Sequence, residues 1–206
     1  MFECRPALAG LLQPRPASPA ASALVVGEES GFALLQVSAF TGSEGELERI
    51  AQHVLGAELP QRVGAPGGCE DRHIFKVGPG QFWIVGPQDA RIACLQDAVP
   101  RQIGSTVSLS HGRTRLFIDG ASSRAVLSGG IALDLHPEVF RPGAYALTDL
   151  QHTPVLLHRV SQHRYELYVL RTYAVWVWEW LTDAALPFGF AVAAAAAPQD
   201  PPEVRT

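Results

Sequence analysis

The stretch HIFKVGPGQFWIV, residues 73–85, decides the fold. Its apolar and β-branched residues predict two strands, 73–77 and 81–85, joined by the loop Gly78-Pro79-Gly80. A three-residue loop with glycine at its end is typical of a β-hairpin, because one loop position needs a positive φ. We therefore expect an antiparallel strand pair at this point of the chain.

Helices are predicted on both sides of this hairpin, and a mostly buried strand over 32–40 precedes the first of them. Ser43 with Glu46 three residues later is typical of a helix N-terminus, and Gly56 is a suitable end. Asp89 begins a second helix that runs to about Val99. The buried stripe of the first helix comprises Leu47, Ile50, Ala51, Val54 and Leu55.

The same order of elements recurs in the second half of the chain. A strand, a short helix, two strands and a long helix are predicted over 113–118, 121–128, 155–160, 165–170 and 171–186. We therefore predict an α+β fold of duplicated strand-helix-strand-strand-helix units, with antiparallel sheets and helices on one face. Residues 31–104 form the first repeat of this scheme and residues 105–189 the second.

Both ends of the chain predict less regular structure. Residues 1–30 are interpreted as an extended N-terminal arm and residues 190–206 as a flexible Ala/Pro tail. Glu3 stands where a secretory signal is cationic, and no apolar run approaches the roughly 18 residues of a membrane span. The three cysteines form no C-x-x-C pair, so we expect no disulfide framework or zinc site. We expect a cytoplasmic protein that does not contact membranes.

Charge argues against a nucleic-acid partner. The formal net charge is −4, so there is no basic excess to release counterions from phosphates. Charged residues make up 17% of the chain, below the usual quarter. The low charge indicates that other proteins cover part of the surface.

Three motifs suggest chemistry, and each also has a simpler structural interpretation. Gly78-Pro79-Gly80 joins two strands, whereas a phosphate loop leads into a helix. Ser110-His111-Gly112-Arg113 offers a hydroxyl and a base, but also fits a turn at a strand edge. Asp134, His136 and Glu138 could hold a metal or exchange protons, yet no second cluster at ligand spacing supports them. We expect Asp134 and His136 to shape their loop through hydrogen bonds, and we predict no catalytic, cofactor-binding or metal-binding residue in this chain.

The last predicted helix carries the candidate interface residues. Its spacing predicts a core stripe of Tyr173, Trp176, Val177, Trp180, Leu181 and Ala184. Trp178 lies about 140° around the helix from Tyr173, beside Val175. Outward tryptophans are typical of interfaces, although the arm or tail of the same chain is an alternative cover. The predicted partner contacts are Trp178 and Val175, with Leu8, Leu11 and Leu12 of the arm.

Several segments together resemble a known family. They are VSLSHGRT at 107–114, Asp119-Gly120 with RAVL at 124–127, LDLHPEVFRPG at 133–143 with Thr148, PVLLHR at 154–159, and WEWL at 178–181. LAGLL at 8–12 and GQFW at 80–83 extend the likeness toward the N-terminus. In this order and spacing they resemble the gamma subunit of heterotetrameric sarcosine oxidase.

The resemblance implies a fold like the folate-binding domain of aminomethyltransferases. It also implies alpha, beta and delta partner subunits in a bacterial complex that oxidatively demethylates sarcosine to glycine with oxygen and tetrahydrofolate. FAD, FMN, NAD and zinc are expected on those partners, and a non-catalytic structural role on this chain. Two alternatives stay open: a free-standing folate-binding or aminomethyltransferase-like protein, and the gamma subunit of a related complex acting on another N-methylated amine.

Overall fold

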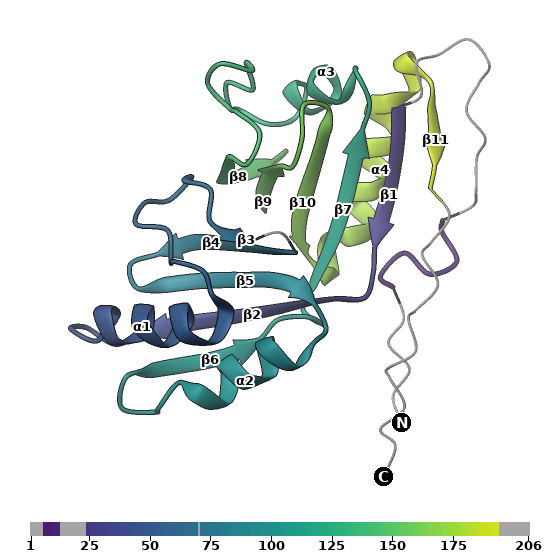
Figure 1. Ribbon diagram of the computed structural model, residues 1–206. Coiled ribbons are helices and arrows are strands. Elements are labelled where there is room, and N and C mark those ends of the chain that lie inside the picture. Colours follow the sequence, from purple (N-terminus) through teal and green to yellow (C-terminus); the bar gives the residue numbers. More distant parts are fainter. Residues whose placement is uncertain (1–5, 13–23, 70, 194–206) are drawn as a thin grey trace.

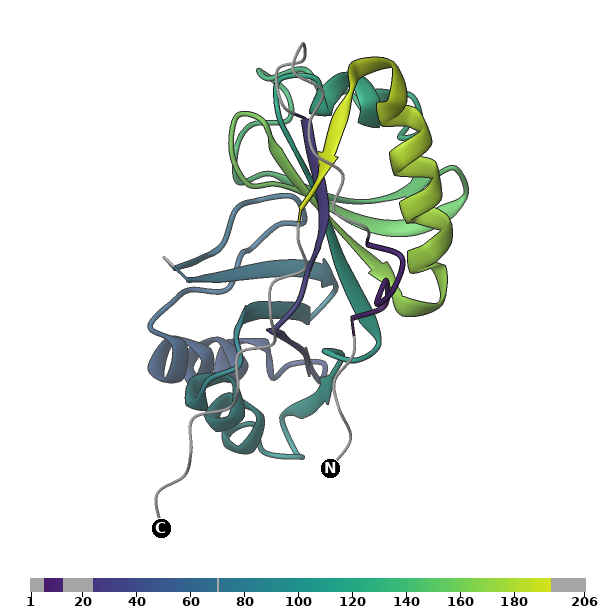
Figure 2. The same cartoon turned by 90° about the vertical axis from the view of Figure 1, so that its right-hand side faces the viewer.

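The protein consists of two β-sheets that lie against each other, with helices on the outer face of each (Figures 1 and 2). The computed structural model describes residues 6–12, 24–69 and 71–193. The chain crosses from one sheet to the other after residue 29 and back after residue 108, so residues 32–108 build one sheet and segments on both sides of them build the other.

The first half of the chain builds a five-stranded antiparallel sheet in the order β3-β4-β5-β2-β6. Its outer face carries α1 (Glu44–Leu55) and α2 (Ala90–Ala98), and apolar side chains of both helices pack on the sheet. The strands are β2 (Phe32–Ala39), β3 (Gly68–Cys69), β4 (Arg72–Gly78), β5 (Gln81–Pro87) and β6 (Gly104–Ser108).

The second sheet has six strands in the order β11-β1-β7-β10-β9-β8. Its outer face carries α3 (Ser123–Ser128) and α4 (Ala174–Ala185), the latter flanked by the 3-10 turns Arg171–Tyr173 and Leu186–Phe188. The sheet is mixed, because β1 and β11 are parallel while its other pairs are antiparallel. The strands are β1 (Leu24–Glu29), β7 (Arg113–Asp119), β8 (Tyr145–Leu150), β9 (Thr153–Arg159), β10 (Arg164–Leu170) and β11 (Phe190–Val192).

Strand alternation divides the apolar residues into a helix-facing core and a core between the sheets. In β5, Phe82 and Ile84 join the core under the helices, whereas Trp83 and Val85 face the other sheet. Tyr145 of β8 fastens the two sheets: its hydroxyl accepts from the Lys76 N–H at 2.6 Å and donates to the Lys76 carbonyl at 2.9 Å. The inter-sheet core comprises Phe32, Leu34, Phe75, Trp83, Val85, Tyr145, Leu156 and Tyr168.

The expected α+β class is confirmed, and so are most of the local signals. Gly56 ends α1 with φ of 70°, and the Asp89 carboxylate accepts from the N–H groups of Arg91 and Ile92 at the start of α2. Ser43 makes no side-chain cap; the Glu44 carboxylate instead accepts from the Gly42 N–H. The elements β2-α1-β4-β5-α2 and β7-α3-β9-β10-α4 follow the same order.

The predicted boundaries at the two ends need correction. Residues 24–29, which we expected within the arm, form β1, and residues 190–192, expected within the tail, form β11. Each strand is stabilised by a distant segment, since β1 pairs with both β7 and β11. The Pro/Ala/Ser stretch 13–22 and most of the tail lie outside the described residues. No helix of the described part is long and apolar enough to cross a membrane.

Candidate functional site

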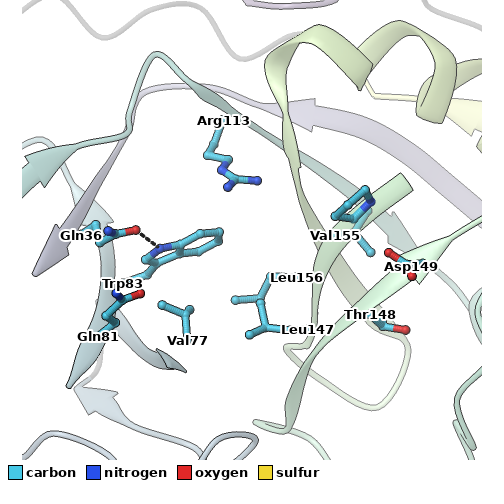
Figure 3. Close-up of a pocket in the computed structure, with 11 residues that line it drawn as sticks. Gln36, Val77, Gln81, Trp83, Arg113, Leu147, Thr148, Asp149, Val155 and Leu156 are labelled. Atoms are coloured by element: carbon cyan, nitrogen blue, oxygen red, sulfur yellow. Dashed lines mark hydrogen bonds between the residues drawn. The ribbon is translucent and has the colours of Figure 1, made fainter. Parts of the chain in front are cut away.

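A pocket of about 420 Å³ opens at the margin of the inter-sheet core (Figure 3). Gln36 and Trp83 line it from the five-stranded sheet, and Leu147 and Leu156 line it from the six-stranded sheet. These side chains lie on the inner faces of their sheets because successive strand residues point to opposite sides. The pocket therefore exists only where the two sheets meet.

The polar chemistry of this pocket is concentrated at Trp83 and Arg113. The indole Nε1 donates to Gln36 Oε1 at 3.0 Å, and the Arg113 guanidinium lies 4.7 Å from the indole ring centre. Burial lowers the pKa of Arg113. Asp149 lies on the opposite wall (Figure 3). The pocket is equipped to bind a group of mixed polarity, and its lining residues include no histidine or cysteine that would serve as a base or nucleophile.

A second polar feature, the inter-sheet ionic cluster, is formed by Arg115, His158, Glu166 and Tyr168. The Tyr168 hydroxyl donates to Glu166 Oε2 at 2.8 Å. The same carboxylate oxygen lies 3.7 Å from His158 Nδ1 and 3.9 Å from Arg115 Nη1. Glu166 and His158 are 4% and 2% exposed. The charges are thus paired inside the protein, as buried charges must be.

The cluster strongly affects the titration of its members. Burial alone raises the pKa of Glu166, but the neighbouring His158, the charge of Arg115 and the Tyr168 hydrogen bond outweigh it and lower this pKa to about 2. Burial and the Glu166 charge raise the pKa of Tyr168 well above its usual value. Glu166 is therefore an ionised anchor whose proton affinity is too low for a general base near neutral pH.

His73 extends the cluster from the six-stranded sheet to the five-stranded one. Its ring lies 4.5 Å from the His158 ring and 6.0 Å from the Phe75 ring. Burial, with a smaller contribution from His158, lowers the pKa of His73 to about 4. Residues from β4, β7, β9 and β10 thus meet in one network that joins the two sheets.

The acidic and imidazole groups predicted at 134–138 lie on an exposed loop. Asp134 accepts a hydrogen bond from the His136 N–H at 2.8 Å, and the Glu138 N–H lies 3.4 Å from His136 Nδ1. The side chains of Asp134 and His136 thus make the local hydrogen bonds expected of residues that shape a loop. Among the described residues, no group of three or more His, Cys, Asp or Glu side chains is placed to hold a metal.

The other two motifs form turns. Gly80 has φ of 61° and closes the β4–β5 hairpin. The Ser110 hydroxyl accepts from the Leu34 N–H at 3.0 Å, which fixes the segment between β6 and β7 against β2. Neither motif contributes to the ionic cluster, although Arg113 enters the inter-sheet pocket.

The predicted orientation of Trp178 is wrong. Trp178 is 7% exposed and belongs to the core under α4, whereas Trp176, expected in the core, is 41% exposed. The buried positions of α4 are Ala174, Val177, Trp178, Leu181 and Ala185. This helix is apolar nearly all round, so two neighbouring stripes fit the spacing and hydrophobicity cannot choose between them.

The polar residues of α4 indicate which of the two stripes is buried. Glu179 and Asp183 stand three and seven residues after Trp176, which places all three on one face of the helix. All three are exposed. Had the polar positions been read before the apolar ones, Trp176 would have been identified as the outward tryptophan.

The arm residues also divide differently from the prediction. Leu8 is fully buried in the core of the six-stranded sheet, because both oxygens of the buried Glu28 carboxylate accept N–H groups from the arm, Ala7 at 2.7 Å and Leu8 at 2.9 Å. Leu8 is therefore corrected from a partner contact to a core residue. Leu12 is half-buried against the same core, while Leu11 is 51% exposed. Val175 lies on the surface, as expected.

The architecture defines the class of protein first. The two-sheet α+β fold resembles that of aminomethyltransferase T of the glycine cleavage system from Bartonella henselae, with a TM-score of 0.57, 15% identity, and coverage of 78% of this chain and 46% of that one. The sarcosine oxidase, gamma subunit family matches residues 50–186. This chain belongs to that family.

Relatives and a solved complex agree with this assignment. The chain is 29% identical to the sarcosine oxidase gamma subunit of Corynebacterium sp. strain P-1 over 84% of this chain and 90% of that subunit. It is 29% identical to the gamma subunit from an Arthrobacter species, over 86% and 92% of the two chains. A chain of the heterotetrameric sarcosine oxidase from Corynebacterium sp. U-96 superposes with a TM-score of 0.81 at 25% identity, covering 94% of this chain and 98% of that one.

Proposed function

We propose that this chain is the non-catalytic, structural gamma subunit of a heterotetrameric sarcosine oxidase. The observation that carries the proposal is the match to one chain of a solved heterotetramer over nearly the full length of both. In this proposal the alpha, beta and delta subunits are its partners. The complex demethylates sarcosine oxidatively to glycine in the cytoplasm, with oxygen and tetrahydrofolate.

The outward face of α4 supports a role in assembly. Tyr173 and Trp176 stand three positions apart and are 44% and 41% exposed, so they are neighbours on the helix surface. Val175 is also exposed, about 100° around the helix from Trp176. Aromatic side chains of this kind are enriched in the energetic centres of protein interfaces. We assign the aromatic face at the start of α4 (Tyr173 and Trp176), with the exposed Val175, to a contact with a partner subunit, and the exposed Leu11 to a second contact.

The placement of the titratable groups supports a structural role. Glu166 and His158, a carboxylate and an imidazole within 3.7 Å, are both buried, and Glu166 also accepts a hydrogen bond from Tyr168. A substrate would have to separate the sheets to reach them. As the family resemblance implies, FAD, FMN, NAD and zinc are assigned in this proposal to the partner subunits.

We further propose that the two sheets descend from one duplicated unit, residues 31–104 and 105–189. The shared element order supports this, as does the correspondence of β4-β5-β2 with β9-β10-β7 in the two sheets. The place taken by β6 beside β2 is filled beside β7 by β1, which comes from the start of the chain.

Co-expression tests the assigned function. We expect the alpha, beta and delta chains to form a complete, active enzyme with this chain, and an incomplete or weakly active one without it. Size-exclusion chromatography with light scattering reports assembly, and sarcosine-dependent oxygen consumption reports activity. A complete and fully active enzyme assembled without this chain would overturn the proposal.

Three further measurements test the proposed contact and separate the alternatives. Trp176→Ala is expected to weaken assembly, whereas Phe40→Ala, a matched removal of an exposed aromatic side chain from the five-stranded half, leaves it unchanged. Titration of the isolated chain with tetrahydrofolate addresses the free-standing folate-binding protein, which micromolar binding would favour. Replacing sarcosine by other N-methylated amines in the assembled enzyme identifies the substrate of the complex.

A further inference from the structure

A second pocket, of about 250 Å³, lies at the end of the six-stranded sheet, away from the inter-sheet pocket. It is formed by the β7–α3 turn, the β9–β10 turn and Pro137 of the 133–143 loop. Its charged and titratable lining residues are Arg124, Arg159, His163 and Tyr165. All of these are cationic or able to donate a hydrogen bond, and the lining includes no carboxylate. We call it the Arg124–Arg159 pocket.

Arg159 is a buried cation, 2% exposed. Its guanidinium donates to three backbone carbonyls: Nε to Ser161 at 3.2 Å, Nη1 to Phe140, and Nη2 to Gln162 at 2.8 Å. Carbonyl dipoles orient the group but do not neutralise it, and within the described chain no ion pair to Arg159 is found at 4.0 Å or less. A guanidinium has five N–H groups, so two remain for another acceptor.

Tyr165 adds a second unsatisfied donor. Its side chain is 1% exposed, and its buried hydroxyl has no hydrogen-bond partner among the described residues. The Arg159 guanidinium lies 5.5 Å from the ring centre. Tyr165 and Arg159 are paired across β10 and β9, and both line the pocket together with Arg124. Burial raises the pKa of Tyr165, while the charges of Arg159 and Arg124 act in the opposite direction.

The acidic residues that adjoin the lining residues in sequence are engaged elsewhere. Glu166, next to Tyr165, belongs to the inter-sheet ionic cluster. Asp119 lies 3.7 Å from the guanidinium of Arg164. Glu138, 87% exposed, lies 4.0 Å from His136. The positive charge of the pocket is therefore not balanced by these carboxylates. A buried uncompensated charge and an unpaired hydroxyl are both costly, so a bound anion would stabilise this arrangement.

We propose that the Arg124–Arg159 pocket binds a small oxyanion, a phosphate or carboxylate group, through the two guanidinium groups and the Tyr165 hydroxyl. Guanidinium groups match the paired oxygens of both ions. This site goes beyond the assembly function, because it needs no partner subunit to form.

A thermal unfolding titration of the full chain tests the proposal. Sodium phosphate is expected to raise the melting temperature by about 3 to 5 °C at ten times its dissociation constant, whereas sodium chloride of equal ionic strength does not. Sodium sulfate and sodium acetate are the further probes. Stabilisation by phosphate and sulfate alone assigns a phosphate-type ligand, and stabilisation by acetate as well assigns a carboxylate.

Three variants locate the binding. Arg124→Gln, at an exposed position, is expected to weaken phosphate binding about tenfold. Tyr165→Phe should weaken it too, while in chloride it leaves the melting temperature unchanged or higher, because an unpaired buried hydroxyl is removed. Arg141→Gln, an exposed arginine of the 133–143 loop outside the pocket lining, is the matched control and should bind normally. The proposal fails if phosphate stabilises no more than chloride does, or if Arg124→Gln binds phosphate as tightly as the wild type.

Discussion

The two halves of the molecule share an element order but differ in the helices that cover them. On the five-stranded sheet, α1 buries Leu47, Ala51 and Leu55 and turns largely polar residues outward. On the six-stranded sheet, α4 buries Trp178 and also exposes Trp176. The surface of α1 is thus largely polar, whereas α4 exposes aromatic side chains of the kind enriched at protein interfaces, as the proposed partner contact needs.

The halves also differ in how they are completed. The five-stranded sheet is built from one continuous stretch, β2 to β6. The six-stranded sheet recruits β1 and β11 from opposite ends of the described chain, and Leu8 of the arm fills its core. The half with the exposed aromatic face is thus also the half that depends on distant segments.

The largest effect is expected from the two tryptophans of α4. Trp178→Ala should lower the free energy of unfolding by about 3–5 kcal/mol, because it leaves a large cavity in the core. Trp176→Ala, two residues away, should change it by less than about 1 kcal/mol. Urea denaturation of both variants measures the difference. Equal losses of stability would contradict the assignment of one residue to the core and the other to the surface.

An intermediate effect is expected in the five-stranded half. The buried Arg72 pairs with Asp71 at 2.6 Å and with Asp89, whose carboxylate also caps α2. Asp89→Ala removes the cap and one counter-ion together, and should cost about 2–3 kcal/mol, moderated because Asp89 is partly exposed.

The companion variant Asp89→Asn separates the contribution of the helix cap from that of the ion pair. It keeps a capping oxygen and loses only the charge, so it should be about 1 kcal/mol more stable than Asp89→Ala by urea denaturation. If the two variants were equally stable, the cap would contribute nothing and the ion pair would account for the whole effect.

The smallest effect concerns pH and the junction of the two halves. His73 titrates near 4 in the folded state and near 6.5 when unfolded, so the unfolded chain binds the proton first as pH falls. The contribution of neutral His73 to stability should therefore be fully present above pH 6.5. The free energy of unfolding should decrease by about 1–2 kcal/mol as pH falls toward 4, allowing for partial exposure.

His73→Gln provides the comparison, measured by urea denaturation between pH 4 and 7. The variant loses ring contacts and is less stable overall, but its stability should vary less with pH in this window. Glu166 cannot mimic the effect, since its contribution is lost only as pH falls from about 4.5 toward 2. A pH dependence identical to that of the wild type would show that His73 titrates normally in the folded protein.

Local patterns determined much of this protein. The hairpin at 73–85, the end of α1 at Gly56 and the Asp89 cap follow from short-range stereochemistry, which each segment carries itself. The α+β class follows from the order of those segments. The seven segments that resemble the gamma subunit of sarcosine oxidase indicate the family from the sequence alone.

Only the tertiary structure decided the rest, because it depends on which distant segments meet. The strands β1 and β11 form because they pair with each other, and β1 also pairs with β7. Leu8 is buried because the Glu28 carboxylate accepts its N–H group. The orientation of Trp178 was chosen by packing, since α4 offers two nearly equal apolar stripes. The ionic cluster and the Arg124–Arg159 pocket combine side chains from separate strands and turns. The sequence does not show which of these charged residues are buried together, and burial is what makes their pairing matter.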